Sequence, residues 1–153
     1  MNTTAPKSET RAIVVEDFLP HSPETVWKAL TDRDYLDRWM MKNDFKPIVG
    51  HRFTFQAQPM GDWNGVVHCE VLVCEAPRKL AYTWVGGSAN NSDYGTALDS
   101  VLTITLEPAA GGTQFKLVHD GFRSPQNDFG FTAMSSGWGT IVKRIDALLR
   151  EAA

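Results

Sequence analysis

The chain has 153 residues, of which 42% are hydrophobic and 22% are charged, and its formal net charge is −3. These values exclude intrinsic disorder as the main state, and the length suits one compact domain. Unbroken apolar stretches such as Val71–Cys74 are far shorter than the ~20 residues of a membrane span, and the polar N-terminus lacks a signal-peptide core. We expect a cytoplasmic protein with one domain over residues 11–152, preceded by a disordered tail at residues 1–10.

The basic residues are scattered along the chain. Runs of Lys and Arg do not exceed two residues, whereas a nucleic-acid surface needs a dense basic stripe. We therefore expect no nucleic-acid partner. Cys69 and Cys74 lie five residues apart in one expected strand, where their side chains point to opposite faces and cannot form a disulfide. Both are expected to be reduced and buried.

The N-terminal third predicts a strand followed by two short helices. Arg11–Leu19 is rich in β-branched residues and is followed by Pro20, as is typical of a strand. Ser22 in front of Pro23 is an N-cap followed by proline at the first helical position. The two helices are expected over residues 23–31 and 34–41.

The middle of the chain predicts successive antiparallel strands. Apolar residues alternate with polar ones, and turns rich in Gly, Pro and Asn separate the segments. The connections are too short for parallel crossovers. The segment 86–99, with Tyr94 near its centre, is long for a hairpin and is expected to act as a lid. The strands are expected at residues 51–57, 66–74, 80–84, 102–106 and 115–119.

The C-terminus changes to a helical period. Apolar residues from Met134 to Leu149 share one helical stripe, which predicts a helix that begins between Asn127 and Thr132 and ends near Glu151. One long helix beside one curved antiparallel sheet of about six strands gives an α+β fold with a two-layer core.

Short segments spread over the chain resemble one family. They are residues 22–32, 36–39, 50–53, 70–72, 77–80, 83–84, 102–108, 119–122 and 137–138. Their order and spacing resemble the activator of heat-shock protein 90 ATPase homologue-like proteins, within the START-related, birch-pollen-allergen-like (SRPBCC) superfamily. The resemblance covers about residues 11–150. It implies the helix-grip fold, in which a curved sheet wraps around the long C-terminal helix and two short helices follow the first strand.

The resemblance also implies an apolar cavity between sheet and helix. Superfamily members use it for lipids, sterols, plant hormones and polyketides, and a minority are cyclases or hydrolases. Inward-facing positions are expected to line this cavity, with His119 or Tyr82 holding a polar group of the ligand, although the same aromatic stripe is compatible with a solid core. The expected cavity residues are Phe53, Phe55, Tyr82, Trp84, Phe115, Leu117, His119, Met134, Trp138 and Ile141.

Two aromatic or polar positions have competing interpretations. His119 is either a ligand contact or general base, or a structural histidine that caps the turn at Asp120-Gly121. Trp63, at a turn tip, either contacts a ligand or partner or folds back on its own hairpin.

The sequence offers little catalytic or metal chemistry. His119, Asp120 and Ser124 do not form a triad, because adjacent strand residues point apart and a nucleophile-elbow sequence is missing. His68 and Cys74 lie about 20 Å apart along a strand, too far to share an ion. We expect no catalytic residue, no metal and no cofactor.

Three functions follow in order of preference. The first is non-covalent binding of a small hydrophobic or amphipathic ligand that is lipid-, sterol- or polyketide-like. The second is a chaperone-associated or stress-related interaction module, which would have a filled core. The third is a cyclase- or hydrolase-like enzyme, which would need a titratable pair inside the cavity. A homodimer and a chaperone contact stay open as alternatives.

Overall fold

The computed structural model describes residues 10–88, 97–124 and 127–152. Within these ranges, one antiparallel sheet of seven strands is combined with three helices. The elements are β1 (Thr10–Leu19), α1 (Pro23–Thr31), α2 (Arg33–Trp39), β2 (Lys42–Asn43), β3 (Arg52–Gln56), β4 (Val66–Glu75), β5 (Lys79–Gly86), β6 (Leu98–Ala109), β7 (Gly112–Arg123) and α3 (Asp128–Ala152).

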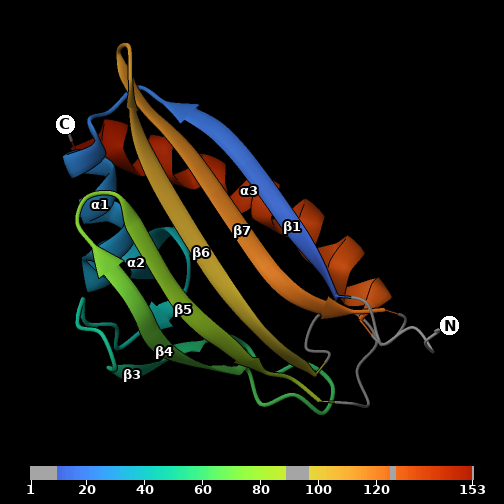
Figure 1. Cartoon of the computed structure of the whole chain (residues 1–153). Helices are drawn as coiled ribbons and strands as arrows, with labels where there is room; N and C mark the ends of the chain where they lie inside the picture. The colour runs from blue at the N-terminus through green and yellow to red at the C-terminus, as the bar shows by residue number, and fades with distance from the viewer. Residues whose placement is uncertain (1–9, 89–96, 125–126, 153) are drawn as a thin grey trace, which may run out of the picture.

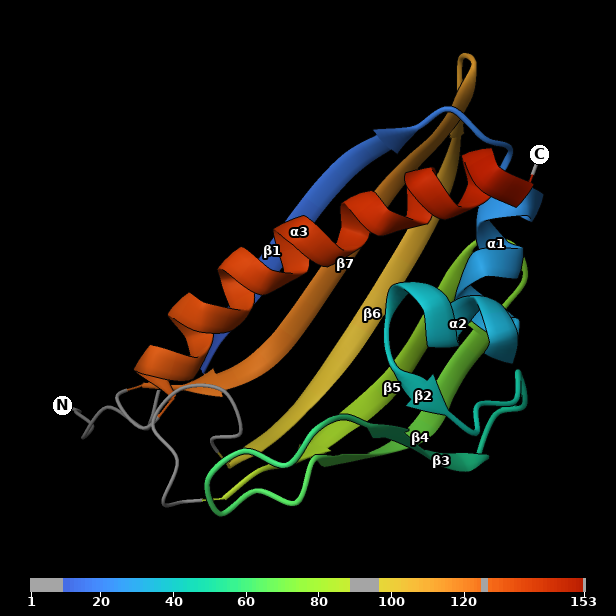
Figure 2. The ribbon, with the colours of Figure 1, turned by 180° about the vertical axis from the view of Figure 1, so that it is seen from behind.

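The strands follow the order β1-β7-β6-β5-β4-β3-β2, so the first strand pairs with the last. The sheet is strongly curved, and α3 lies along one of its faces (Figure 1). Seen from behind, α1 and α2 lie beside the C-terminal end of α3 (Figure 2). Sheet and helices therefore form two layers with the core between them.

Capping residues explain why two short helices form instead of one. At the start of α1, the backbone N–H of Thr25 donates to Ser22 Oγ at 3.2 Å. Asp32 then ends α1 with an extended backbone, and its carboxylate accepts the N–H of Asp34 at 2.9 Å. One residue thus serves as the C-cap of α1 and the N-cap of α2.

Aromatic side chains fill the core next to α2. Phe53 contacts Phe45 and Tyr82 edge-on, with ring centroids 5.1 Å apart in both pairs. Phe55 continues the cluster toward Trp84 at 5.5 Å. Phe53 and Phe55 come from the inner face of β3, Tyr82 and Trp84 from β5, and Phe45 from the segment between β2 and β3. The core is solid in this region.

The predicted fold is confirmed: a curved antiparallel sheet, a long C-terminal helix and two short helices after the first strand. The seventh strand is the two-residue β2, too short to predict from alternation. β6 continues through Pro108 to Ala109, beyond the predicted end at residue 106. Pairing of β6 with β5 stops at Thr105, so the missing N–H of Pro108 costs no ladder bond there.

Some predicted boundaries shift or cannot be compared. Thr10, assigned to the tail, is the first residue of β1, whereas residues 1–9 lie outside the described ranges. Gly86 ends β5 and Leu98 begins β6, so the expected loop 86–99 is shorter, and Tyr94 lies outside the described residues. In the described part of the chain, none of the helices is long and apolar enough to cross a membrane.

Candidate functional site

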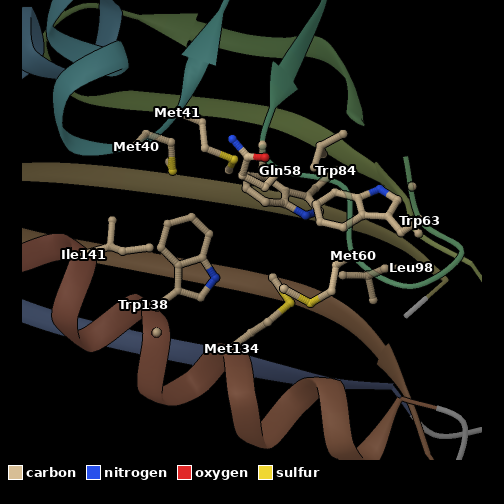
Figure 3. Close-up of a pocket in the computed structure, with 15 residues that line it drawn as sticks. Met40, Met41, Gln58, Met60, Trp63, Trp84, Leu98, Met134, Trp138 and Ile141 are labelled. Carbon is tan, nitrogen blue, oxygen red and sulfur yellow. The ribbon is translucent and has the colours of Figure 1, made fainter. Parts of the chain in front are cut away.

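A pocket of about 320 Å³ lies between α3, the inner face of the sheet and the loop that joins β3 to β4. Figure 3 shows Trp84 and Trp63 on the sheet side of this pocket and Trp138, Met134 and Ile141 on the side of α3. The described lining residues are Met40, Met41, Ala57, Gln58, Met60, Trp63, Val67, Trp84, Gly86, Gly87, Leu98, Met134, Gly137, Trp138 and Ile141.

The wall of this pocket is apolar and uncharged. Three tryptophans and four methionines account for much of it, and its described lining residues include no Asp, Glu, Lys, Arg or His. Gln58 supplies the amide on the wall and is itself exposed to solvent. Such a surface favours an apolar molecule over an ion, because a charge placed there would lose water without gaining an oppositely charged partner.

The β3–β4 loop is held in shape by its own hydrogen bonds. The backbone groups of Met60 and Trp63 exchange two hydrogen bonds of 3.0 Å, and the Trp63 indole N–H donates to the Val66 carbonyl at 3.0 Å. Trp63 thus folds back on its own hairpin, as one of its two sequence interpretations predicted, and it also lines the pocket.

Four of the ten residues predicted to line a cavity lie on this wall, namely Trp84, Met134, Trp138 and Ile141. The other six do not line it, because the inner face of the sheet is longer than the pocket and side chains fill the rest. Those six are almost wholly buried in the packed core: Phe53, Phe55, Tyr82, Phe115, Leu117 and His119.

Several wall residues were missed by the sequence analysis. Met40 and Met41 follow α2, Gln58 and Met60 come from the β3–β4 loop, and Leu98 begins β6. Alternation cannot reveal loop residues, since they have no period. The single available signal was the apolar character of Met60 and Trp63 within a turn otherwise rich in Gly, Pro, Asp and Asn.

His119 lies behind the pocket wall in a directed chain of hydrogen bonds. The Trp138 indole N–H donates to His119 Nδ1 at 3.0 Å. Ser100 Oγ donates to the Trp84 carbonyl at 2.8 Å, so it must accept from His119 Nε2 across their 2.8 Å contact. The imidazole therefore carries its proton on Nε2 and connects two residues of the wall, Trp84 and Trp138.

This arrangement keeps the imidazole neutral. Burial lowers the pKa of His119 from 6.5 to about 3. Protonation of Nδ1 would also point a second N–H at the Trp138 donor. His119 has no lone pair left for a substrate or for the Ser100 hydroxyl, so it cannot act as their general base. It is a structural histidine, although its partners are Ser100 and Trp138 rather than the turn at Asp120-Gly121.

Tyr82 and Cys69 are buried in the core and are not among the described residues that line the pocket. Burial, and then the nearby Cys69, raise the pKa of the Tyr82 hydroxyl well above its ordinary value. Cys69 is buried and Cys74 half-buried, and both are free thiols. Among the described residues, no group of three or more His, Cys, Asp or Glu side chains is arranged to hold a metal ion.

A family match and several solved structures relate the chain to known proteins. The family described as Activator of Hsp90 ATPase homolog 1-like protein matches residues 20–150. The search of curated proteins found no match.

Among solved structures, protein MLL2253 from Mesorhizobium loti is 40% identical, with a TM-score of 0.80 over 94% of this chain and 99% of that one. Protein BH1534 from Bacillus halodurans is 25% identical, with a TM-score of 0.73 over 94% and 99%. The Aha1 dimer from Colwellia psychrerythraea is 16% identical, with a TM-score of 0.72 over 91% and 96%, and shows the shared fold. The predicted resemblance is confirmed: the chain belongs to the family of Activator of Hsp90 ATPase homolog 1-like proteins.

Proposed function

We propose that this protein binds a small, mainly apolar ligand in the pocket between α3 and the sheet, without covalent chemistry. The observation that carries the proposal is an opening of about 320 Å³ in a core that is otherwise closely packed. Its volume lies at the lower end of the range of small-molecule sites, and its wall has their usual apolar and aromatic composition.

The physical driving force is removal of apolar surface from water. Each Å² of ligand surface that the pocket buries contributes roughly 25 cal/mol. Met40, Met41, Met60 and Met134 are unbranched and polarisable, so their side chains adjust to ligands of different outline. The composition supports a site for a hydrophobic molecule of modest size.

Two observations favour this proposal over the alternatives. An interaction module that acts through its surface has no need of an opening in its core, whereas a ligand-binding protein does. An enzyme acting in the pocket needs a titratable group aimed at its substrate, and both ring nitrogens of His119 are already bonded within the protein.

Filling the pocket from α3 tests the proposal. Gly137 lines the pocket, whereas a Cβ at Gly139 would meet nothing within 4 Å. We expect Gly137→Leu to weaken binding of the uncharged fluorescent probe N-phenyl-1-naphthylamine at least tenfold, because the new side chain occupies its volume. Titration of probe fluorescence measures the change.

Gly139→Leu is the matched control, since it makes the same change two residues away and outside the pocket wall. It is expected to bind the probe like the wild type. Thermal unfolding of both variants checks that each is folded. Unchanged probe affinity in a folded Gly137→Leu variant would contradict the proposal.

A further inference from the structure

We infer that the ligand is an uncharged, mainly apolar molecule with a hydrogen-bond acceptor, and that the Trp84 indole N–H donates to this acceptor. The inference rests on the proposed function and specifies the chemistry of the same pocket.

The Trp84 indole nitrogen is the starting observation. Trp84 is only 6% exposed and lines the pocket. No hydrogen bond joins its Nε1 to another residue in the described part of the chain, yet no buried side-chain nitrogen or oxygen there lacks a partner. The nitrogen must therefore reach accessible space, and for this residue that space is the pocket. An N–H donor facing an apolar cavity is a ready partner for a ligand acceptor.

The other two indoles of the wall are already engaged. Trp63 donates to the Val66 carbonyl at 3.0 Å, and Trp138 donates to His119 at 3.0 Å. Of the three tryptophans on the wall, Trp84 alone keeps its donor for a ligand. The three residues have the same indole side chain, but Trp63 and Trp138 already use their N–H groups within the protein.

The Trp84 ring is held in place before a ligand arrives. It contacts Phe55 at 5.5 Å, His119 at 5.3 Å and Trp138 at 5.5 Å between ring centroids. Its backbone carbonyl accepts from Ser100 at 2.8 Å. A donor fixed in this way needs little ordering on binding, which favours affinity.

The wall also discriminates by charge. Its described residues include no cationic side chain, and the Gln58 amide is neutral. A carboxylate or sulfonate in the pocket would lose its hydration and gain at most hydrogen bonds from neutral donors. A neutral acceptor such as a ketone oxygen loses far less water, and the Trp84 N–H replaces that loss.

Three probes with the same naphthalene ring separate these effects. 2-Acetylnaphthalene carries a neutral acceptor, 2-ethylnaphthalene replaces the carbonyl by a methylene, and 2-naphthoate carries an anion. By equilibrium dialysis we expect the acetyl compound to bind about fivefold more tightly than the ethyl compound, the typical effect of one neutral hydrogen bond. The naphthoate is expected to bind at least tenfold more weakly than the acetyl compound.

Trp84→Phe and Trp63→Phe form a matched pair of variants. Each removes one indole from the wall, but only Trp84 has an N–H available to the ligand. We expect Trp84→Phe to lower the ratio of the ethyl to the acetyl dissociation constant from about five to one or below, because the ketone oxygen then loses water without gaining a donor. Trp63→Phe is expected to weaken both compounds alike and to keep the ratio of the wild type.

Indole N–H signals in the NMR spectrum of the wild-type protein supply a readout that does not depend on a variant's folding. The acetyl compound is expected to shift one indole signal downfield, and the ethyl compound is not. Equal affinity for the two compounds, or an unchanged ratio in a folded Trp84→Phe variant, overturns the inference and leaves the proposed function intact. If Gly137→Leu does not weaken binding of any probe, the proposed function fails and the inference falls with it.

Discussion

A single buried imidazole organises the back of the pocket wall. His119 accepts from the Trp138 indole and donates to Ser100, which in turn donates to the carbonyl of Trp84. Each polar group in this series of hydrogen bonds has a partner, as buried polar groups require. The histidine thus acts on the pocket indirectly, by fixing the positions of two tryptophans that line it.

The neutral state of His119 predicts a loss of stability in acid. The unfolded chain takes up a proton near the ordinary histidine pKa of 6.5, whereas burial lowers the pKa of the folded state to about 3. Acid therefore favours the unfolded state. Stability is complete above about pH 6.5 and falls between pH 6.5 and 3, by about 1.4 kcal/mol per pH unit in the middle of this window. Urea unfolding at several pH values measures the slope.

His119→Leu is expected to cost about 1–3 kcal/mol at pH 7.5, because it leaves Ser100 and the Trp138 N–H without their partner. It should also flatten the slope between pH 6.5 and 3. His68→Gln, at an exposed histidine of β4, should keep the wild-type slope. The assignment fails if His119→Leu retains the full pH dependence.

At the scale of elements, the β3–β4 loop determines one side of the pocket. Gly65 has a φ of +84°, and a Cβ at this position would collide with the carbonyl oxygen of Ala57. The two strands approach closely here, and the Ala57 N–H donates to the Gly65 carbonyl at 2.7 Å. Only glycine fits at position 65, where the two ends of the loop meet. This close approach determines the path of the loop through Met60 and Trp63.

Gly65→Ala is therefore expected to displace the loop. It should lower the free energy of unfolding by more than about 2 kcal/mol and weaken binding of N-phenyl-1-naphthylamine. Gly50→Ala is the control, since Gly50 has a similar φ of +89° but open space around its Cβ position. That variant should lose about 1–2 kcal/mol by strain alone and bind the probe normally. Urea unfolding and probe titration distinguish the two.

At the scale of the molecule, residues far apart in sequence join the helices to the sheet. His21, which precedes α1, lies 2.7 Å from Asp146 of α3, and its carbonyl accepts from Thr113 of β7 at 2.7 Å. Burial alone would raise the pKa of the Asp146 carboxyl, but hydrogen bonds from His21 and Arg150 outweigh it and hold the pKa below its ordinary value. The carboxylate therefore stabilises the folded state.

Asp146→Asn should lower the free energy of unfolding at pH 7 by about 1 kcal/mol, since the site is only partly shielded from water. The native contribution is present above the ordinary carboxyl pKa and disappears as the pH falls through the lowered one, so the two proteins should converge in acid. Glu151, which also lies on α3, forms a more exposed ion pair with Arg38 of α2. Glu151→Gln should change stability by less than about 0.5 kcal/mol. Equal effects of both variants in chemical unfolding would contradict this ranking.

The extent to which the sequence predicted the molecule also depends on scale. Alternation in the strands and the stripe on α3 predicted the layers, because burial of one face dictates both patterns. The same alternation could not separate Phe55, in the solid core, from Trp84, on the pocket wall, since both face inward. That distinction depends on how far α3 and the loops extend across the sheet. The local alternation of apolar and polar residues carries no information about this extent.

The described pocket wall is assembled from residues within 40–41, 57–67, 84–87 and 134–141, together with Leu98. These segments span most of the chain, so no short fragment contains the site, and it forms only once the last helix has docked on the sheet. A ligand that binds there recognises only the fully folded protein and shifts the unfolding equilibrium toward it by mass action. The fraction of protein with an occupied pocket therefore measures only fully folded molecules.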